Sequence, residues 1–246
     1  MTTLTLLPCD AATVLCDVAA IDALHLAALA MPGWPAVPSL PARHPLLAHV
    51  LDNHRCNALL WEQEDQARRT DVPDSAIVAN KRAIDRYNQQ RNDAIEAMDA
   101  AILEALAAER IAPAADAWVN SETAGSLIDR MSIGTLKVHH MALQAERGDA
   151  DEAHRQRCAV RLAALREQRD HLGRCLRQMW SGMLAGRCTY RAHRQFKMYN
   201  DPALNPFLYG TAAPSDAAGR AREARGRRAG SAGSVMPAAS HDDRRH

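Results

Sequence analysis

The feature that most constrains this chain is a long helical pattern whose apolar face is interrupted by polar residues. At about 100° per residue, one narrow face of the segment 75–110 carries Ile77, Ile84, Ile95, Met98, Ile102 and Leu106. Asn88 and Arg91 fall on that same face, between Ile84 and Ile95. A core-facing amide or guanidinium is costly unless it is hydrogen-bonded or paired. The rest of the fold must therefore supply partners for these two side chains.

Four further helical segments predict an all-α fold. They cover about residues 10–30, 45–69, 120–147 and 151–185, with a Pro-rich loop after the first helix. No segment shows the polar–apolar alternation of a strand. The pattern predicts a single helical bundle of about five helices over residues 1–209, followed by a disordered Ala/Gly/Arg-rich tail at 210–246. The aromatic segment 194–209 is predicted to dock on this bundle as a non-helical strap.

Charge and cysteine usage exclude several classes of function. The formal net charge is +1, which argues against an electrostatic nucleic-acid binder. The six cysteines are scattered without a C-x-x-C pair, as in a reduced cytosolic protein. The apolar N-terminal stretch has no Lys or Arg before Arg43, and Asp10, Asp17 and Asp22 interrupt it. We therefore expect neither a signal peptide nor a membrane span, and a cytoplasmic location.

Polar groups also occupy the inner faces of three other predicted helices. They are Asn57, Glu64 and Arg68 on the second helix, Ser132 and His139 on the fourth, and Arg169 on the fifth. Arg169 takes the place of a leucine in a heptad-like apolar seam, a pattern that also permits a homodimer. Arginine is suited to bidentate capture of carboxylate or phosphate. Backbone N–H groups at the helix entry 121–126 would add to an anion site.

Two interpretations of these inner polar residues remain open. In the first, a pocket between helices binds a small anionic metabolite through Asn57, Arg68, Asn88, Arg91, Ser132 and Arg169, with Glu64 or His139 as acid or base. In the second, the same residues form a paired network that only fixes helix register, and the chain is a non-enzymatic accessory protein. Asp65, Asp85 and Asp129 are the nearest acids to balance the arginines.

No metal site or cofactor is expected. The chain has no H-E-x-x-H motif and no Gly-rich phosphate loop. Glu62 with Asp65, and Glu96 with Asp99, have the i, i+3 spacing with which helical nucleotide pyrophosphatases hold Mg²⁺. These pairs point away from the apolar faces, so we interpret them as solvated residues.

Four ordered motifs resemble an uncharacterised bacterial family, the domain of unknown function 4254. They are the run from Asn57 to Arg68, the run from Lys81 to Asp93, the run from Asn120 to Ile133, and the run from Phe196 to Pro202. The resemblance spans roughly residues 43–209. It implies a helical fold and a link to glycosyltransferases of surface-polysaccharide synthesis, but no established activity. Ala124 departs from the family's Pro at a first helical position, where Pro is favoured.

Overall fold

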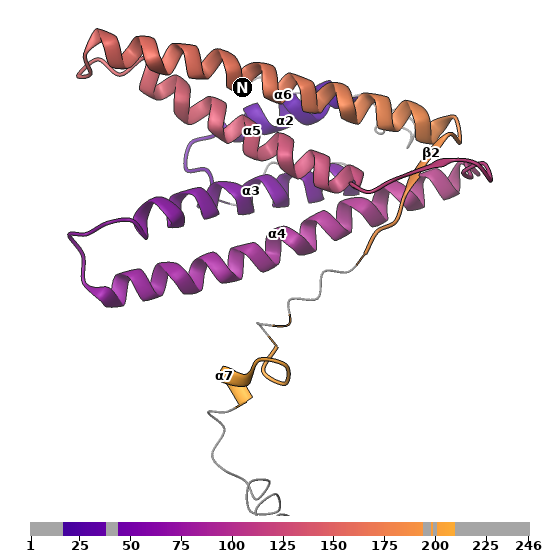
Figure 1. Cartoon of the computed structure of the whole chain (residues 1–246), viewed down its shortest axis with the longest axis horizontal. Coiled ribbons are helices and arrows are strands. Elements are labelled where there is room, and N and C mark those ends of the chain that lie inside the picture. The colour runs from indigo at the N-terminus through magenta and orange to yellow at the C-terminus, as the bar shows by residue number, and fades with distance from the viewer. Residues whose placement is uncertain (1–16, 38–43, 194–197, 199–200, 210–246) are drawn as a thin grey trace, which may run out of the picture. The chain divides into compact units, whose positions relative to one another are not determined.

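The computed structural model describes residues 17–37, 44–193, 198 and 201–209, and it confirms the all-α prediction (Figure 1). The elements in chain order are α2 (Val18–Leu29), α3 (Pro45–Gln66), α4 (Asp74–Ala108), β1 (Trp118–Asn120), α5 (Ala124–Ala145), α6 (Glu152–Leu184), β2 (Cys188–Tyr190) and α7 (Pro206–Tyr209). The chain divides into two compact units, Met1–Arg194 and Gln195–His246. Among the described residues, none of the helices has the length and hydropathy needed to cross a membrane.

The first unit consists mainly of two antiparallel helical hairpins, α3–α4 and α5–α6 (Figure 1). Both hairpin loops lie at the same end of the bundle, on the left of the view. Local sequence signals set where these helices begin. Pro45 occupies the first turn of α3, the Thr123 side chain accepts from Ser126 N at the start of α5, and Asp151 accepts from His154 N at the start of α6.

The hydrophobic core lies where the two hairpins and α2 meet. Each element contributes fully buried side chains, among them Ile21 from α2, Val50 from α3, Met98 from α4, Ile128 from α5 and Leu176 from α6. The helical periodicity in the sequence therefore identifies the core faces correctly. Most of the heptad-like seam of α6 is buried, whereas Leu165 and Leu172 are partly exposed, and Arg169 stands at the interrupted position.

A short parallel pairing of β1 with β2, which the sequence did not predict, closes the bundle at the end opposite the hairpin loops (Figure 1). Trp118 pairs with Cys188 and Asn120 with Tyr190. Strands of three residues are too short for an alternating pattern to appear in the sequence. The strands flank the α5–α6 hairpin, so the chain enters and leaves this hairpin at one place.

Three details of the structure differ from the sequence prediction. Helix α4 begins at Asp74, one residue before the predicted start, with Pro73 as its N-cap. Helix α2 begins at Val18 with Asp17 as N-cap, and the predicted start near residue 10 lies outside the described residues. Residues 206–209 form one helical turn where we predicted a non-helical strap. The rest of that strap, apart from 198 and 201–205, and the whole tail 210–246 lie outside the described residues.

Candidate functional site

Asp129 is the centre of a buried polar network that joins both hairpins. It lies on the inner face of α5 and is only 3% exposed. Its Oδ1 accepts from Asn53 Nδ2 at 2.9 Å and Asn57 Nδ2 at 3.0 Å, both from α3, and from Arg91 Nε at 2.8 Å, from α4. Arg91 Nη2 donates to Oδ2, which completes a bidentate ion pair. Four hydrogen bonds to one carboxylate offset much of the free-energy cost of burying its charge.

One helical turn further along α5, Ser132 extends the network to two buried histidines. Ser132 Oγ accepts from Asn57 Nδ2 at 3.0 Å and lies 2.8 Å from His54 Nδ1. The His54 ring contacts the His25 ring, tilted by 30° at a centroid distance of 4.5 Å, and stacks on the Trp34 ring at 5.8 Å. The remaining ring nitrogen of His54 and both ring nitrogens of His25 are buried without a hydrogen-bond partner in the described part of the chain.

These two histidines are neutral in the folded chain. Burial, with the His54 ring and the Arg169 cation nearby, holds the pKa of His25 well below its usual value. Burial also lowers the pKa of His54 to about 4; the nearby backbone of His25, which favours a protonated ring, opposes this shift, and Arg169 adds to it. Protonating either ring would place a charge in a site that offers it little solvation.

Arg169 forms a second ion pair next to the histidines. Its Nη2 lies 2.8 Å from Asp22 Oδ1, and its Nε donates to Thr135 Oγ1 at 2.8 Å. Burial raises the pKa of Asp22, and the Arg169 charge partly opposes that rise. Arg169 therefore links α6 to α2 and α5, and its charge is compensated inside the fold.

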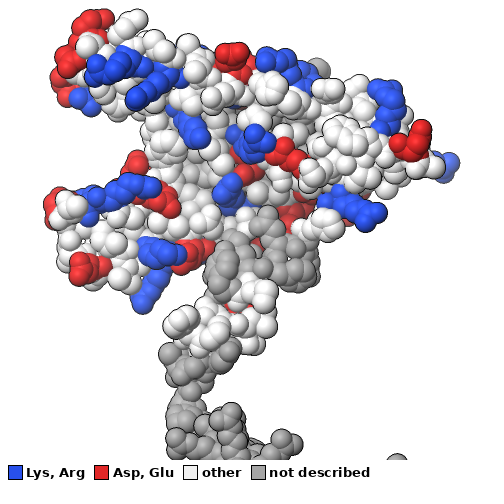
Figure 2. Space-filling model, viewed as in Figure 1, with Lys and Arg blue, Asp and Glu red and all other residues white. Residues whose placement is uncertain are grey.

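A pocket of about 330 Å³ opens on the inner side of the α3–α4 hairpin where it faces α5. We call it the inter-hairpin pocket. It is lined by Asn57, Leu60, Trp61, Glu64, Asp65, Arg68, Asn88, Arg91, Ile133 and Leu136. In the space-filling view a hollow separates the loop ends of the two hairpins, on the left of the picture (Figure 2). Five predicted site residues, Asn57, Glu64, Arg68, Asn88 and Arg91, thus meet at one pocket.

Arg91 belongs to both the buried network and this pocket. Its side chain is 26% exposed, and its hydrogen bonds to Asp129 raise the pKa of the guanidinium. One bond is donated by Arg91 Nε and the other by Arg91 Nη2, and Arg91 Nη1 has no acceptor among the described residues. Asp129 therefore fixes the orientation of Arg91 and leaves one N–H₂ group available to a ligand.

One tryptophan and two histidines form a cluster of rings beside the pocket. The Trp61 ring, which lines the pocket, stacks on the His140 ring at 4.4 Å with an interplanar angle of 2°. His139 meets His140 edge-on at 5.3 Å. Burial, followed by the neighbouring His139, lowers the pKa of His140. His139 itself does not line the pocket, so it acts on this site only through His140.

The other predicted residues lie away from the pocket or already have partners. Ser132 is buried beneath it, and Arg169 lines a different cavity on the outer side of α5 and α6. Arg68 is exposed and forms an ion pair with Glu64 at 3.0 Å. Of the three acids proposed to balance the arginines, Asp129 does so, whereas Asp85 pairs with Lys81.

The predicted anion position at the start of α5 is occupied by the chain's own Asp99. Its Oδ1 accepts from Gly125 N at 2.7 Å, and Asp99 is only 3% exposed. Burial raises the pKa of Asp99, and its hydrogen bonds with Thr123 and Gly125 oppose that rise. The interpretation of Asp99 as a solvated residue was wrong, because a helix N-terminus stabilises a buried carboxylate.

Sequence reasoning missed several members of this network. Asp22 and His25 stand in an apolar segment, where they were treated as interruptions or ignored, and His54 was not singled out. Two signals in the sequence could have found them. Asp22 and His25 are spaced i, i+3, and Asn53, His54 and Asn57 share one face of α3. Among the described residues, no group of three or more His, Cys, Asp or Glu side chains is arranged to hold a metal ion.

Comparison with known proteins adds a family match. The model of the family described as "Protein of unknown function (DUF4254)" matches residues 47–192, more than half of the chain. The matched region includes both hairpins, the buried network from α3 to α6 and every residue of the inter-hairpin pocket. No curated protein and no solved structure matches the chain.

Proposed function

This chain belongs to that family of proteins of unknown function, and we propose that its inter-hairpin pocket binds a small anionic metabolite of the phosphorylated-sugar or nucleotide-sugar type. One observation carries the proposal. The buried carboxylate of Asp129 holds Arg91 by two N–H groups at the wall of the pocket and leaves Nη1 without an acceptor among the described residues. A guanidinium held in this way needs little reorganisation to bind an anion.

The remaining lining suits a ligand that has both an anionic group and hydroxyl groups. Arg68 adds a second guanidinium, while Asn57 and Asn88 offer amides and Glu64 a carboxylate for hydroxyl groups. Trp61 provides an apolar surface for the face of a sugar ring. The volume of about 330 Å³ lies at the lower end of the range for small-molecule sites.

If the bound molecule is transformed, Glu64 is the residue placed to act as acid or base. It lines the pocket and is held by Arg68 at 3.0 Å. His139 lies behind His140 and would position the Trp61–His140 stack rather than touch the ligand. Binding is the core of the proposal, and a chemical step at Glu64 is its extension.

The cellular setting is a separate part of the proposal. A role in bacterial surface-polysaccharide synthesis, with a glycosyltransferase as partner, is supported by the family resemblance. A cytoplasmic location is supported by the scattered, unpaired cysteines. The homodimer that the α6 seam suggested stays a prediction; Leu176, Met179 and Met183 of that seam are buried in the chain's own core.

A second candidate is a non-enzymatic accessory protein, and one observation favours it. Each arginine proposed to hold the anion has an acidic partner: Asp129 for Arg91, Glu64 for Arg68 and Asp22 for Arg169. In this interpretation the polar groups specify helix packing only.

Thermal unfolding of the full chain with sugar phosphates and nucleotide sugars separates the two candidates. A ligand at 100 times its Kd stabilises by about 2.7 kcal/mol, a rise in Tm of a few degrees for a domain of this size. Arg68→Gln should remove most of the shift. Arg69→Gln is a matched control, since Arg69 is also exposed, pairs with Asp71 and does not line the pocket. A flat response of the wild-type chain would refute metabolite binding and favour the accessory protein.

A further inference from the structure

A second groove runs along the outer side of the α5–α6 hairpin. Two adjoining cavities of about 450 and 400 Å³ form it, and they share Arg130, His171 and Leu172. One end reaches Trp118 on β1 and the other reaches Lys137 on α5. No polar residue is common to this groove and the inter-hairpin pocket. We call it the α5–α6 groove.

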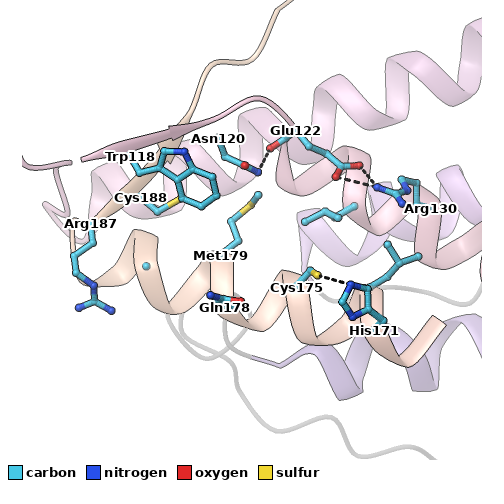
Figure 3. A pocket seen from close by; sticks show the side chains of 13 residues that line it. Trp118, Asn120, Glu122, Arg130, His171, Cys175, Gln178, Met179, Arg187 and Cys188 are labelled. Carbon is cyan, nitrogen blue, oxygen red and sulfur yellow. Dashed lines mark hydrogen bonds and ion pairs between the residues drawn. The ribbon is translucent and has the colours of Figure 1, made fainter. Parts of the chain in front are cut away.

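The end of the groove next to β1 holds an aromatic and apolar patch, bordered by the polar side chains of Asn120, Gln178 and Arg187 (Figure 3). Trp118 is 66% exposed, a large fraction for tryptophan, and it lines this end together with Leu127 and Met179. Figure 3 shows Met179 in the middle of the cavity, between Trp118 and the ion pair of Glu122 with Arg130. This end is suited to a flat apolar group.

The other end is cationic. Arg130, Lys137, Gln168, Arg169 and His171 line it, and no carboxylate of the described chain does so. Glu122 holds Arg130 through Nη1 alone, at 2.8 and 3.0 Å, so that Nε and Nη2 have no acceptor among the described residues. Lys137 also has no ion-pair or hydrogen-bond partner among the residues that the structure describes. Two cations on one face of α5 are thus available to an anion.

The charge distribution of the fold adds to this local effect. Helices α5 and α6 together carry nine Lys or Arg and four Asp or Glu, a formal charge of +5. Helices α3 and α4 carry five Lys or Arg and ten Asp or Glu, a formal charge of −5. The nearly neutral chain is therefore strongly dipolar, and its field directs anions towards the α5–α6 side.

We propose that the α5–α6 groove binds an organic phosphate that has a flat apolar body. The apolar body lies against Trp118 and Met179, and the phosphate lies between Arg130 and Lys137. These cations are two helical turns apart on one helix, roughly 10 Å along its axis at 1.5 Å per residue, a span that two long side chains close around a phosphate. The proposal does not depend on the function of the inter-hairpin pocket.

Calorimetric titration of the full chain with three matched probes tests this proposal. They are 1-naphthyl phosphate, 1-naphthol and inorganic phosphate. We expect 1-naphthyl phosphate to bind at least about tenfold more tightly than either of its parts, because only it contacts both ends of the groove. Lys137→Ala and Trp118→Ala should each weaken its binding by about tenfold. Both side chains are exposed, so these variants keep the fold.

Two control variants make the outcome decisive. Lys81→Ala removes an exposed lysine from the opposite hairpin and should leave binding unchanged. Arg68→Gln should also leave it unchanged, although we expect it to weaken ligand binding at the inter-hairpin pocket, which Arg68 lines. Equal affinity for the three probes, or no effect of Lys137→Ala and Trp118→Ala, would overturn the proposal. Loss of binding in Arg68→Gln would assign the phosphate to the other pocket and overturn it as well.

Discussion

Lowering the pH from 7 to 5 should destabilise the folded chain by about 2 kcal/mol through His54 alone. The pKa of this buried ring falls from about 6.5 in the unfolded chain to about 4 in the folded one. Between these values only the unfolded chain binds the proton, so stability falls as the pH decreases, by about 1.4 kcal/mol per unit. The loss begins near pH 6.5 and is complete below about pH 4. His25, with its pKa also lowered, adds to it.

The variant His25→Phe tests the contribution of the second buried histidine to this loss of stability. His25 is fully buried and neither ring nitrogen has a hydrogen-bond partner in the described structure, so phenylalanine removes no hydrogen bond. The new ring keeps the contact with the His54 ring. We expect the free energy of unfolding at pH 7 to be unchanged or higher. The loss between pH 7 and pH 5 should be smaller than in wild type.

Urea unfolding at both pH values, followed by tryptophan fluorescence, measures these free energies. Burial raises the pKa values of Asp22 and Asp99, so these groups act in the opposite direction, but they are present in both proteins and cancel in the comparison. His193→Gln is the control, because His193 is exposed. Equal losses of stability in wild type and His25→Phe would refute the contribution assigned to His25.

Two further predictions concern the packing of the network. Asp129→Asn should destabilise the chain by about 3 kcal/mol in urea unfolding, because it leaves the partly buried Arg91 without its carboxylate; a cost near zero would contradict this. Gly125→Ala should cost about 1–3 kcal/mol, because the added Cβ lies 2.7 Å from the Ile95 carbonyl oxygen. Gly134→Ala is its matched control, with its nearest neighbour at 3.5 Å, and equal Tm values for the two variants would show that the close approach is relieved at no cost.

Helical periodicity predicted the buried face of most helices, but it also placed Glu64 and Arg68 on an inner face, whereas their side chains are 47% and 68% exposed. It placed Arg91 and Asn57 on inner faces, where the structure finds them, and it required partners for Arg91. It did not identify Asp129 as the partner among three candidate acids. Periodicity gives the direction of a side chain around its own helix, whereas a contact between helices depends on their axial positions relative to one another.

The features that were missed or misassigned depend on contacts between distant segments. Asp99 looked like a solvated acid until the N-terminus of α5 was placed against it. The pairing of β1 with β2 joins two segments that have no strand pattern of their own. His25 and His54 each stand in helices with apolar neighbours, and only the contact of their rings at 4.5 Å reveals a buried pair. Such contacts have no local signature in a single sequence.

The parallel pairing of β1 with β2 also bears on the order of folding events. The strands flank the α5–α6 hairpin, so pairing them in an unfolded chain would require the closure of a long loop at a large cost in entropy. Once the hairpin has formed from its local contacts, the two strands are already close, so pairing them requires little further loss of chain entropy. Strand pairing is therefore a late step, and amide exchange at Trp118, which donates to the Arg187 carbonyl, reports whether the hairpin is complete.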